Sequence, residues 1–193
     1  MPILTLASHI WNQKDYLAFE RANEERHEYF NGEVRKMNRG NANHTLIVGS
    51  AAASIYSQLR SRPHKVYMLN LRLKVQSIGF YTYFDIGVTS DDVQLEDEHK
   101  DTLLNPTLLI EILSPSTENY DRGEKFRRYS NLDSLQEYLL IAQDTPRIER
   151  YLRQANNEWL LTEVAGLDAT LELPSIQCTL ALVDVYEKVT FGE

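Results

Sequence analysis

A nearly continuous apolar run, TLLIEIL at residues 107–113, constrains the fold of this chain more than any other segment. Side chains on a strand alternate between the two faces of its sheet, so a strand that is apolar at consecutive positions must be covered on both faces. A second run of this kind, EYLLIA at residues 137–142, follows a segment with helical signals. Two buried strands joined by a helix predict an α/β (α+β) fold in which helices cover a sheet.

The segments before the first buried strand predict a helix, two strands and a loop. Residues 43–60 are rich in Ala and Ser, which allows a helix to pack closely on a sheet. Residues 66–75 alternate in polarity and residues 81–90 are rich in β-forming side chains, so both predict strands. The acidic residues 91–101 predict an exposed loop.

A second helix is expected between the two buried strands. Asp121 and Glu124 have the spacing of a capping box, so this helix is predicted to begin near Arg122. The predicted core therefore has the order α-β-β-β-α-β.

Additional elements on both sides of the core complete a single predicted domain of 193 residues. A helix is expected at residues 12–25, and Asn31-Gly32 supplies the two positive-φ residues of a tight hairpin turn. A second hairpin and an amphipathic tail are expected after the core. The predicted boundaries are 1–42 for the N-terminal decoration, 43–143 for the core and 144–193 for the C-terminal hairpin and tail.

Several protein classes are excluded by composition. No window approaches the roughly 18 apolar residues that span a bilayer, and MPILTLASHIW lacks the basic leader of a signal peptide. The single Cys178 excludes an internal disulfide and a cysteine zinc site. These features predict a soluble, cytoplasmic protein with no membrane partner.

Charge is unevenly distributed along the chain. The net charge is −8, yet residues 34–74 contain eight Lys or Arg and no Asp or Glu. Because a phosphate backbone responds to the local field, this stretch predicts a basic face that borders a nucleic-acid site. The alternative is that these residues only decorate a solvated surface.

Two carboxylates, Asp85 and Glu111, interrupt apolar strand segments. An ionised carboxylate in such a strand loses hydration at a cost of several kcal/mol unless it is compensated. A divalent cation shared by both would remove their repulsion, and oxygen ligands favour Mg²⁺ or Mn²⁺. The alternative is that one acid pairs with a buried Arg or caps a loop.

Lys125 is the third candidate, because it lies on the first turn of the predicted second helix and can point back toward Glu111. An ammonium beside a metal-bound water would lower the pKa of that water or orient it for attack on phosphorus. The alternative is an ordinary exposed lysine on a helix.

The chain resembles a known family in the segments YFDIGV, NPTLLIEILSPST, DRGEKFRRY and EYLLIAQD. They are similar to those of a bacterial putative restriction-endonuclease-like family, classed as a domain of unknown function, in the PD-(D/E)XK nuclease superfamily. The resemblance extends from RHEYFNGEV to the hairpin after RIERY and implies a restriction-endonuclease-like core.

By this resemblance, Asp85 is the aspartate of the PD motif and Glu111 the acid of the (D/E)XK motif. The chain departs from the pattern at two positions: Phe84 replaces the proline, and Leu113 stands where the lysine normally lies. The resemblance implies that the lysine has moved to the following helix, which gives Lys125 its role.

Three further residues are accessory candidates. Glu28 lies on the first hairpin, where similar nucleases bring an extra acid toward the metal, although it could be a surface residue. His44 begins the first core helix and could bind a phosphate or orient water, or could simply start the helix. Gln143 could reach a nucleotide near the site, although a strand-end cap is the simpler interpretation.

These residues predict a Mg²⁺-dependent endonuclease that hydrolyses DNA phosphodiester bonds, with Asp85 and Glu111 holding the metal and Lys125 assisting. One alternative is a catalytically inactive nucleic-acid-binding or protein-interaction module on the same fold. Another is a scaffold or toxin-type regulator defined by its partner. The C-terminal hairpin could form a homodimer.

Overall fold

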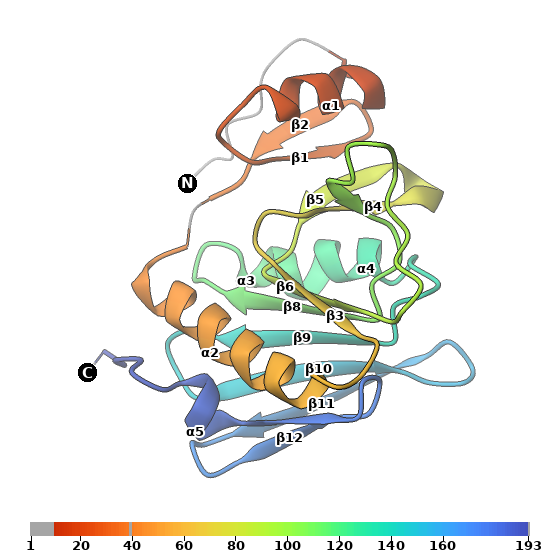
Figure 1. Ribbon diagram of the computed structural model, residues 1–193. Helices are drawn as coiled ribbons and strands as arrows, with labels where there is room; N and C mark the ends of the chain where they lie inside the picture. Colours follow the sequence, from red (N-terminus) through yellow and green to blue (C-terminus); the bar gives the residue numbers. More distant parts are fainter. Residues whose placement is uncertain (1–9, 39, 193) are drawn as a thin grey trace.

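A six-stranded sheet forms the centre of the molecule, which is described by a computed structural model covering residues 10–38 and 40–192 (Figure 1). The apolar start of the chain, residues 1–9, and Arg39 lie outside the described residues. The two buried strands lie side by side and parallel in the sheet, while every other neighbouring pair is antiparallel. In spatial order the strands are β11 (Trp159–Ala165), β10 (Arg147–Arg153), β9 (Glu137–Ala142), β8 (Leu108–Leu113), β6 (Ile86–Thr89) and β3 (Lys65–Met68).

The predicted first core helix is confirmed as α2 (Ala42–Leu59), which covers one face of this sheet. Its buried side chains include Ile47, Ala51 and Ile55, which pack on the even-numbered residues of β8. The odd-numbered residues of β8 face the opposite core, where Tyr129 and Tyr138 pack. Both faces are therefore covered, as the apolar run predicted, and Glu111 points to the face opposite α2.

A second sheet of five strands carries the N-terminal part of the chain. The helix α1 (Gln13–Arg21) packs on its hairpin, and Asn31 (φ 50°) and Gly32 (φ 84°) form the predicted turn. The central strand of this five-stranded sheet, Phe80–Tyr83, pairs with the first strand of the hairpin. The N-terminal segment is therefore an integral part of the sheet. In spatial order the strands are β2 (Glu33–Lys36), β1 (His27–Phe30), β5 (Phe80–Tyr83), β4 (Arg72–Val75) and β7 (Thr102–Leu103), with a 3₁₀ turn, η1 (Gln76–Ile78), between β4 and β5.

The strands predicted at residues 66–75 and 81–90 are each divided in two, so the predicted order of three core strands is too simple. The N-terminal half of the first predicted strand, β3, and the C-terminal half of the second, β6, belong to the six-stranded sheet. The remaining halves, β4 and β5, belong to the five-stranded sheet. The chain bends at Leu69, which has a φ of 57°. Its amide donates to the Asp85 carbonyl over 3.1 Å. Asp85 therefore lies at the junction of the two sheets rather than within a strand.

The predicted start of the second core helix near Arg122 is wrong. The helix begins one turn earlier as α3 (Glu118–Tyr120), passes through a π-helical turn, η2 (Asp121–Lys125), and ends as α4 (Phe126–Tyr129). Backbone turns that begin at Ser114 start the helix directly after β8. The side chain of Asp121 is buried beside Lys125 and does not cap the helix.

The predicted C-terminal hairpin is confirmed as β10 and β11. The amphipathic tail contains a second hairpin, β12 (Thr170–Leu173) and β13 (Cys178–Ala181), and a short helix, α5 (Leu182–Val185). Both pack against the core formed with α2. No helix in the described part of the chain has the length and apolar character needed to cross a membrane.

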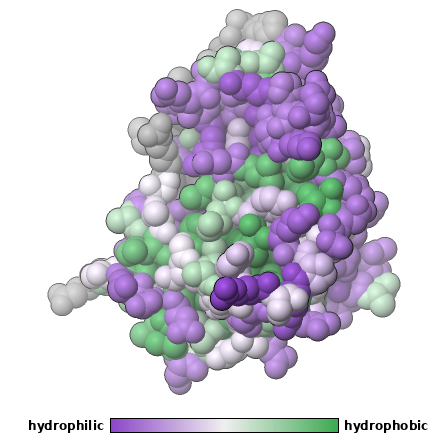
Figure 2. Space-filling view, viewed as in Figure 1, coloured by the Kyte–Doolittle hydropathy of each residue, from purple (hydrophilic) through white to green (hydrophobic). Residues whose placement is uncertain are grey.

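The two parts of the molecule differ in surface character (Figure 2). Hydrophilic residues cover the lobe formed by α1, β1 and β2, and hydrophobic residues gather over the face that carries α2. On that helix Leu46 is 38% exposed and Tyr56 is 61% exposed. Neither residue lines the pocket at the junction of the sheets, which is bordered by Asp85, Glu111 and His44.

Candidate active site

Asp85 and Glu111 come together at the junction of the two sheets. β6 and β8 are antiparallel with Ile86 opposite Ile110, so continuing the register by one residue places Asp85 opposite Glu111. Both side chains line one small pocket, of about 40 Å³, together with His44. A larger hollow of about 510 Å³ beside Arg153 contains none of the predicted site residues.

Asp85 is fixed by two contacts to one of its oxygens. Its Oδ2 accepts a hydrogen bond from the Ile112 amide over 2.8 Å and lies 3.1 Å from His44 Nε2. The imidazole projects from the first turn of α2, whose N-terminus is capped by Asn41. A Cβ at Gly40 would overlap the His44 ring, so the glycine allows the chain to pass close to it. His44 therefore positions Asp85.

Glu111 is buried on β8 and receives two donors on one oxygen. Lys125 Nζ lies 2.9 Å from its Oε1, and the Tyr129 hydroxyl donates to the same atom over 2.8 Å. Burial raises the pKa of Glu111 to about 8; the Lys125 ammonium opposes this rise, and the carboxylate of Asp85 adds to it. Tyr129 was not predicted, because its contact arises only from the folding of the helix over β8.

Lys125 is almost completely buried, with 3% of the residue exposed. Besides its contact with Glu111, its ammonium lies 3.6 Å from Asp121 Oδ1. Although burial lowers the pKa of Lys125, the carboxylates of Glu111 and Asp121 raise it by more, so the side chain remains protonated. The side chain thus has the position relative to Glu111 that the sequence predicted.

Asp121 is a residue whose place in the site the sequence did not reveal. It is 4% exposed, and burial raises its pKa. The signal available in the sequence was its spacing of four residues from Lys125, which puts both side chains on one face of the helix. The three-residue spacing of Asp121 and Glu124 predicts a helix cap instead and conceals this relation to Lys125.

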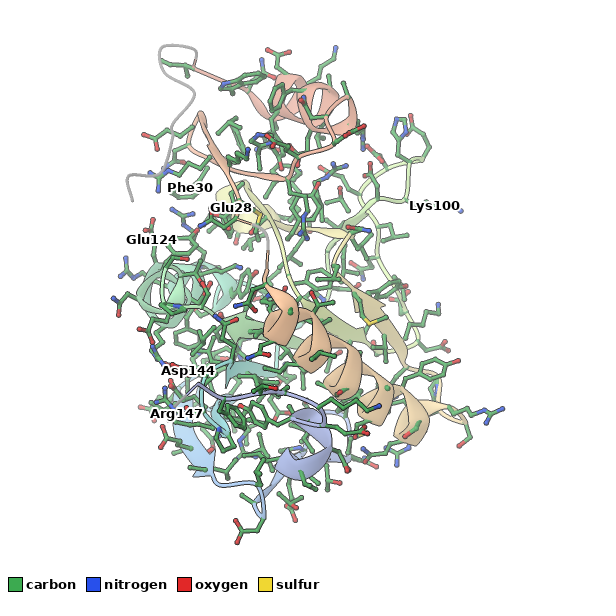
Figure 3. All side chains as sticks on the ribbon, turned by 90° about the vertical axis from the view of Figure 1, so that its left-hand side faces the viewer. Glu28, Phe30, Lys100, Glu124, Asp144 and Arg147 are labelled. Atoms are coloured by element: carbon green, nitrogen blue, oxygen red, sulfur yellow. The ribbon has the colours of Figure 1, made fainter. Side chains whose placement is uncertain are left out.

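Glu28 lies on β1 and reaches the helix that follows β8, as Figure 3 shows for Glu28 and Phe30 above Glu124. Its carboxylate accepts hydrogen bonds from Thr82 over 2.5 Å and from Tyr120 over 2.7 Å. In the described residues it makes no direct contact with Asp85 or Glu111. Its charge raises the pKa of Lys125, so it acts on the site through space.

Gln143 is not brought into the pocket. It follows β9 and is buried, and its Oε1 has no hydrogen-bond partner among the described residues. The structure therefore does not unite it with the other candidates.

The predicted basic face at residues 34–74 is wrong. Arg60, Arg62 and Lys65 lie at or beyond the C-terminal end of α2, roughly 27 Å from its start at 1.5 Å per residue. Acidic residues outside the stretch neutralise much of the remaining charge. Glu33 directly precedes the stretch on β2, whereas folding brings the other acids alongside from more distant segments. The pairs are Arg35 with Glu33, Lys36 with Glu25, Arg72 with Asp101, and Lys74 with Glu96.

The oxygens at this site suit a hydrated divalent cation. In the described residues, Asp85 Oδ1 and Glu111 Oε2 accept no hydrogen bond, so one oxygen of each carboxylate is available. Among the residues that the structure describes, no three or more His, Cys, Asp or Glu side chains are grouped with metal-binding geometry. Mg²⁺ commonly keeps several waters and binds through only one or two carboxylates, so two acids fit this ion.

Comparisons with known proteins identify a family. The profile of a family described as "Uma2: Putative restriction endonuclease" matches residues 13–183. Two uncharacterized proteins of Synechocystis sp. are similar. One is 33% identical over 180 residues, covering 92% of this chain and 92% of the relative. The other is 30% identical over 158 residues, covering 82% of this chain and 89% of the relative.

A solved structure has the same fold. A crystal structure described as "a putative nuclease belonging to DUF820" from Anabaena variabilis has a TM-score of 0.77. It is 19% identical and matches 93% of this chain and 99% of its own. At this identity the likeness shows a shared fold, and it agrees with the fold class that the sequence resemblance implied.

Proposed function

Because the chain belongs to the Uma2 family, described as a putative restriction endonuclease, we propose that it is a Mg²⁺-dependent endonuclease that hydrolyses phosphodiester bonds in DNA. The observation that carries the proposal is a buried ammonium, Lys125 Nζ, 2.9 Å from Glu111, which shares a pocket with Asp85. Burying the charged groups of Lys125 and Glu111 together is costly for stability, and such arrangements are concentrated at functional sites.

Asp85 and Glu111 would hold the ion through Oδ1 and Oε2, which accept no hydrogen bond from the described part of the chain. Mn²⁺ would suit the same oxygens. When bound, the cation would polarise a phosphoryl oxygen and favour ionisation of a water molecule. His44 and the Ile112 amide hold Asp85 Oδ2, so its other oxygen faces the pocket in a fixed orientation.

Lys125 would stabilise the negative charge on the phosphoryl oxygens in the transition state and orient the attacking water. Its position is fixed by Glu111 on one side and Asp121 on the other, so little reorganisation is needed during the reaction. Tyr129 donates to the same oxygen of Glu111 as Lys125 and leaves Oε2 available. Burial and the nearby carboxylate raise the pKa of Tyr129, which keeps its hydroxyl a donor.

We also propose that the protein forms a homodimer and acts in the cytoplasm, where it would encounter DNA. β11 is the outermost strand of the six-stranded sheet, and one of its backbone edges pairs with no strand in the described residues. Leu160 and Leu161 on this strand are 49% and 52% exposed. A long edge strand with exposed apolar side chains can pair with a second copy of the chain.

The test is a cleavage assay on plasmid and single-stranded DNA, with Mg²⁺, with Mn²⁺ and with EDTA. We expect metal-dependent cleavage by the wild type and none by Asp85→Ala or Glu111→Gln. Asp91→Asn, an exposed acid in the loop before β7, is the matched control and should remain active. DNA binding without cleavage under every metal condition would support the inactive binding module instead.

A further inference from the structure

Arg26 is a cation in the acidic pocket and has no carboxylate partner among the residues that the structure describes. It precedes β1, is half-buried and lines the pocket together with Asp85 and Glu111. In the described residues its guanidinium forms no ion pair, whereas Arg21, Arg72 and several other arginines do. A positive charge that faces carboxylates without pairing with them is available to an anion bound between them.

The guanidinium is held in place by the bend that also holds Asp85. Arg26 Nη1 donates to the Leu69 carbonyl over 2.8 Å, and the Leu69 amide donates to the Asp85 carbonyl over 3.1 Å. Leu69 therefore links the two pocket residues through its own backbone. Its left-handed φ of 57° is an uncommon conformation for leucine, and such conformations concentrate at functional sites.

Other contacts fix the orientation of Arg26 and leave donors available. The guanidinium lies over the Tyr83 ring, 5.6 Å from its centre, and the Arg26 carbonyl accepts from the Met37 amide over 2.8 Å. Nε and Nη2 have no acceptor among the described residues. Two donors on one planar fork match two oxygens of a phosphate better than any other common anion except a carboxylate.

From this arrangement we propose that Arg26 binds a phosphate of the nucleic-acid backbone at the mouth of the pocket. The proposal rests on the proposed function and names how that site recognises its substrate. The pocket of about 40 Å³ is too small to hold a nucleobase. Recognition at this position is therefore of the backbone and independent of base sequence.

The experiment measures binding of a fluorescein-labelled DNA duplex by anisotropy in EDTA, which prevents cleavage, at several salt concentrations. We expect Arg26→Ala to weaken binding about 10-fold, as for the loss of one charge-assisted contact. The slope of log K against log salt should become shallower by about 0.9, which corresponds to one phosphate contact. Arg26→Lys keeps the charge but loses the fork, so its affinity should be intermediate and its slope unchanged.

Arg60→Ala is the matched control. This arginine is exposed at the far end of α2 and has no ion pair among the described residues, so its removal should leave affinity and slope unchanged. Thermal unfolding of each variant separates a folding defect from a binding defect. If Arg26→Ala does not fold, the affinity of Arg26→Lys still tests whether the guanidinium fork binds phosphate.

Failure of this inference is distinguishable from failure of the proposed function. If the wild type binds and cleaves DNA, and Arg26→Ala has the same affinity and salt slope as the wild type, only the role of Arg26 is overturned. Wild-type protein that neither binds nor cleaves DNA would overturn both.

Discussion

Replacing Glu111 with glutamine should make the stability of the protein less sensitive to a rise in pH from 5 to 8, while abolishing its proposed activity. The carboxyl of Glu111 is buried, and its pKa is raised from 4.5 to about 8. The folded state therefore holds a proton that the unfolded state releases. Stability is unaffected by this group below pH 4.5, falls as the pH rises, and reaches its full loss above pH 8. A glutamine side chain cannot ionise, so this loss disappears in the variant.

The expected magnitude follows from the size of the pKa shift. Each pKa unit corresponds to about 1.4 kcal/mol, so a rise from 4.5 to about 8 corresponds to roughly 5 kcal/mol in total. Integration between pH 5 and pH 8 gives about 3–4 kcal/mol, because the loss is incomplete at pH 8 and has already begun at pH 5. Lys125 stays protonated in the folded and unfolded states over this range, so it contributes little to the slope.

The assay is urea denaturation of wild type and Glu111→Gln at pH 5 and pH 8 in EDTA. Wild type should lose about 3–4 kcal/mol more unfolding free energy than the variant over this range. Glu98→Gln, an exposed acid of the loop before β7, should follow the wild type. Mg²⁺ should restore stability at pH 8 in the wild type only, because the ion binds the ionised carboxylate. Parallel losses in wild type and Glu111→Gln would refute the reasoning.

Three further predictions concern neighbouring parts of the structure. Lys125→Ala should reduce the rate of cleavage by about 10²-fold, while Mg²⁺ binding measured by calorimetry persists. Adding Leu113→Lys to this variant should restore part of the rate if only the position of the charge matters. An undiminished rate in Lys125→Ala would exclude a role for Lys125 in cleavage. Tyr129→Phe removes the 2.8 Å donor to Glu111 and should destabilise the protein by about 1 kcal/mol in urea denaturation, with a changed pH profile of cleavage; an unaltered profile would limit Tyr129 to packing. Leu161→Lys should convert a homodimer into monomers in light scattering, because the charge lies on the exposed edge strand, and unchanged mass would place any dimer contact elsewhere.

Much of the architecture could be predicted because it depends on local chemistry. The run at residues 107–113 has no polar face, so burial on both sides was its only low-energy solution. Asn31-Gly32 tolerates the positive φ angles of a tight turn, and α2 has the small residues that let a helix approach a sheet. None of these features depends on a distant part of the chain.

The error in the helix start has a physical cause that lies outside the local pattern. Asp121 and Glu124 have the spacing of a cap, but turns from Ser114 start the helix directly after β8. Asp121 then becomes an interior residue beside Lys125, where its charge contributes to the site. The same aspartate can cap a helix or support a lysine, and packing decided between these roles.

The basic stretch shows a similar limit. Along the sequence, residues 34–74 contain no acid, yet Arg72 and Lys74 face Asp101 and Glu96 from the following loop. Charge patterning along the chain describes only one partner of each pair. The electric field around a residue depends on every segment that folds beside it.

The sequence by itself singled out the residues to which we assign the proposed chemistry: one acid in a buried strand, another in a segment beside it, and a lysine on the next helix. The tertiary structure decided how they act together. The bend at Leu69 places Asp85 at the junction of the sheets and anchors Arg26 beside it, while the helix over β8 brings Tyr129 to Glu111. Such contacts join residues far apart in sequence, and only the energy of packing two sheets and a helix together fixes them.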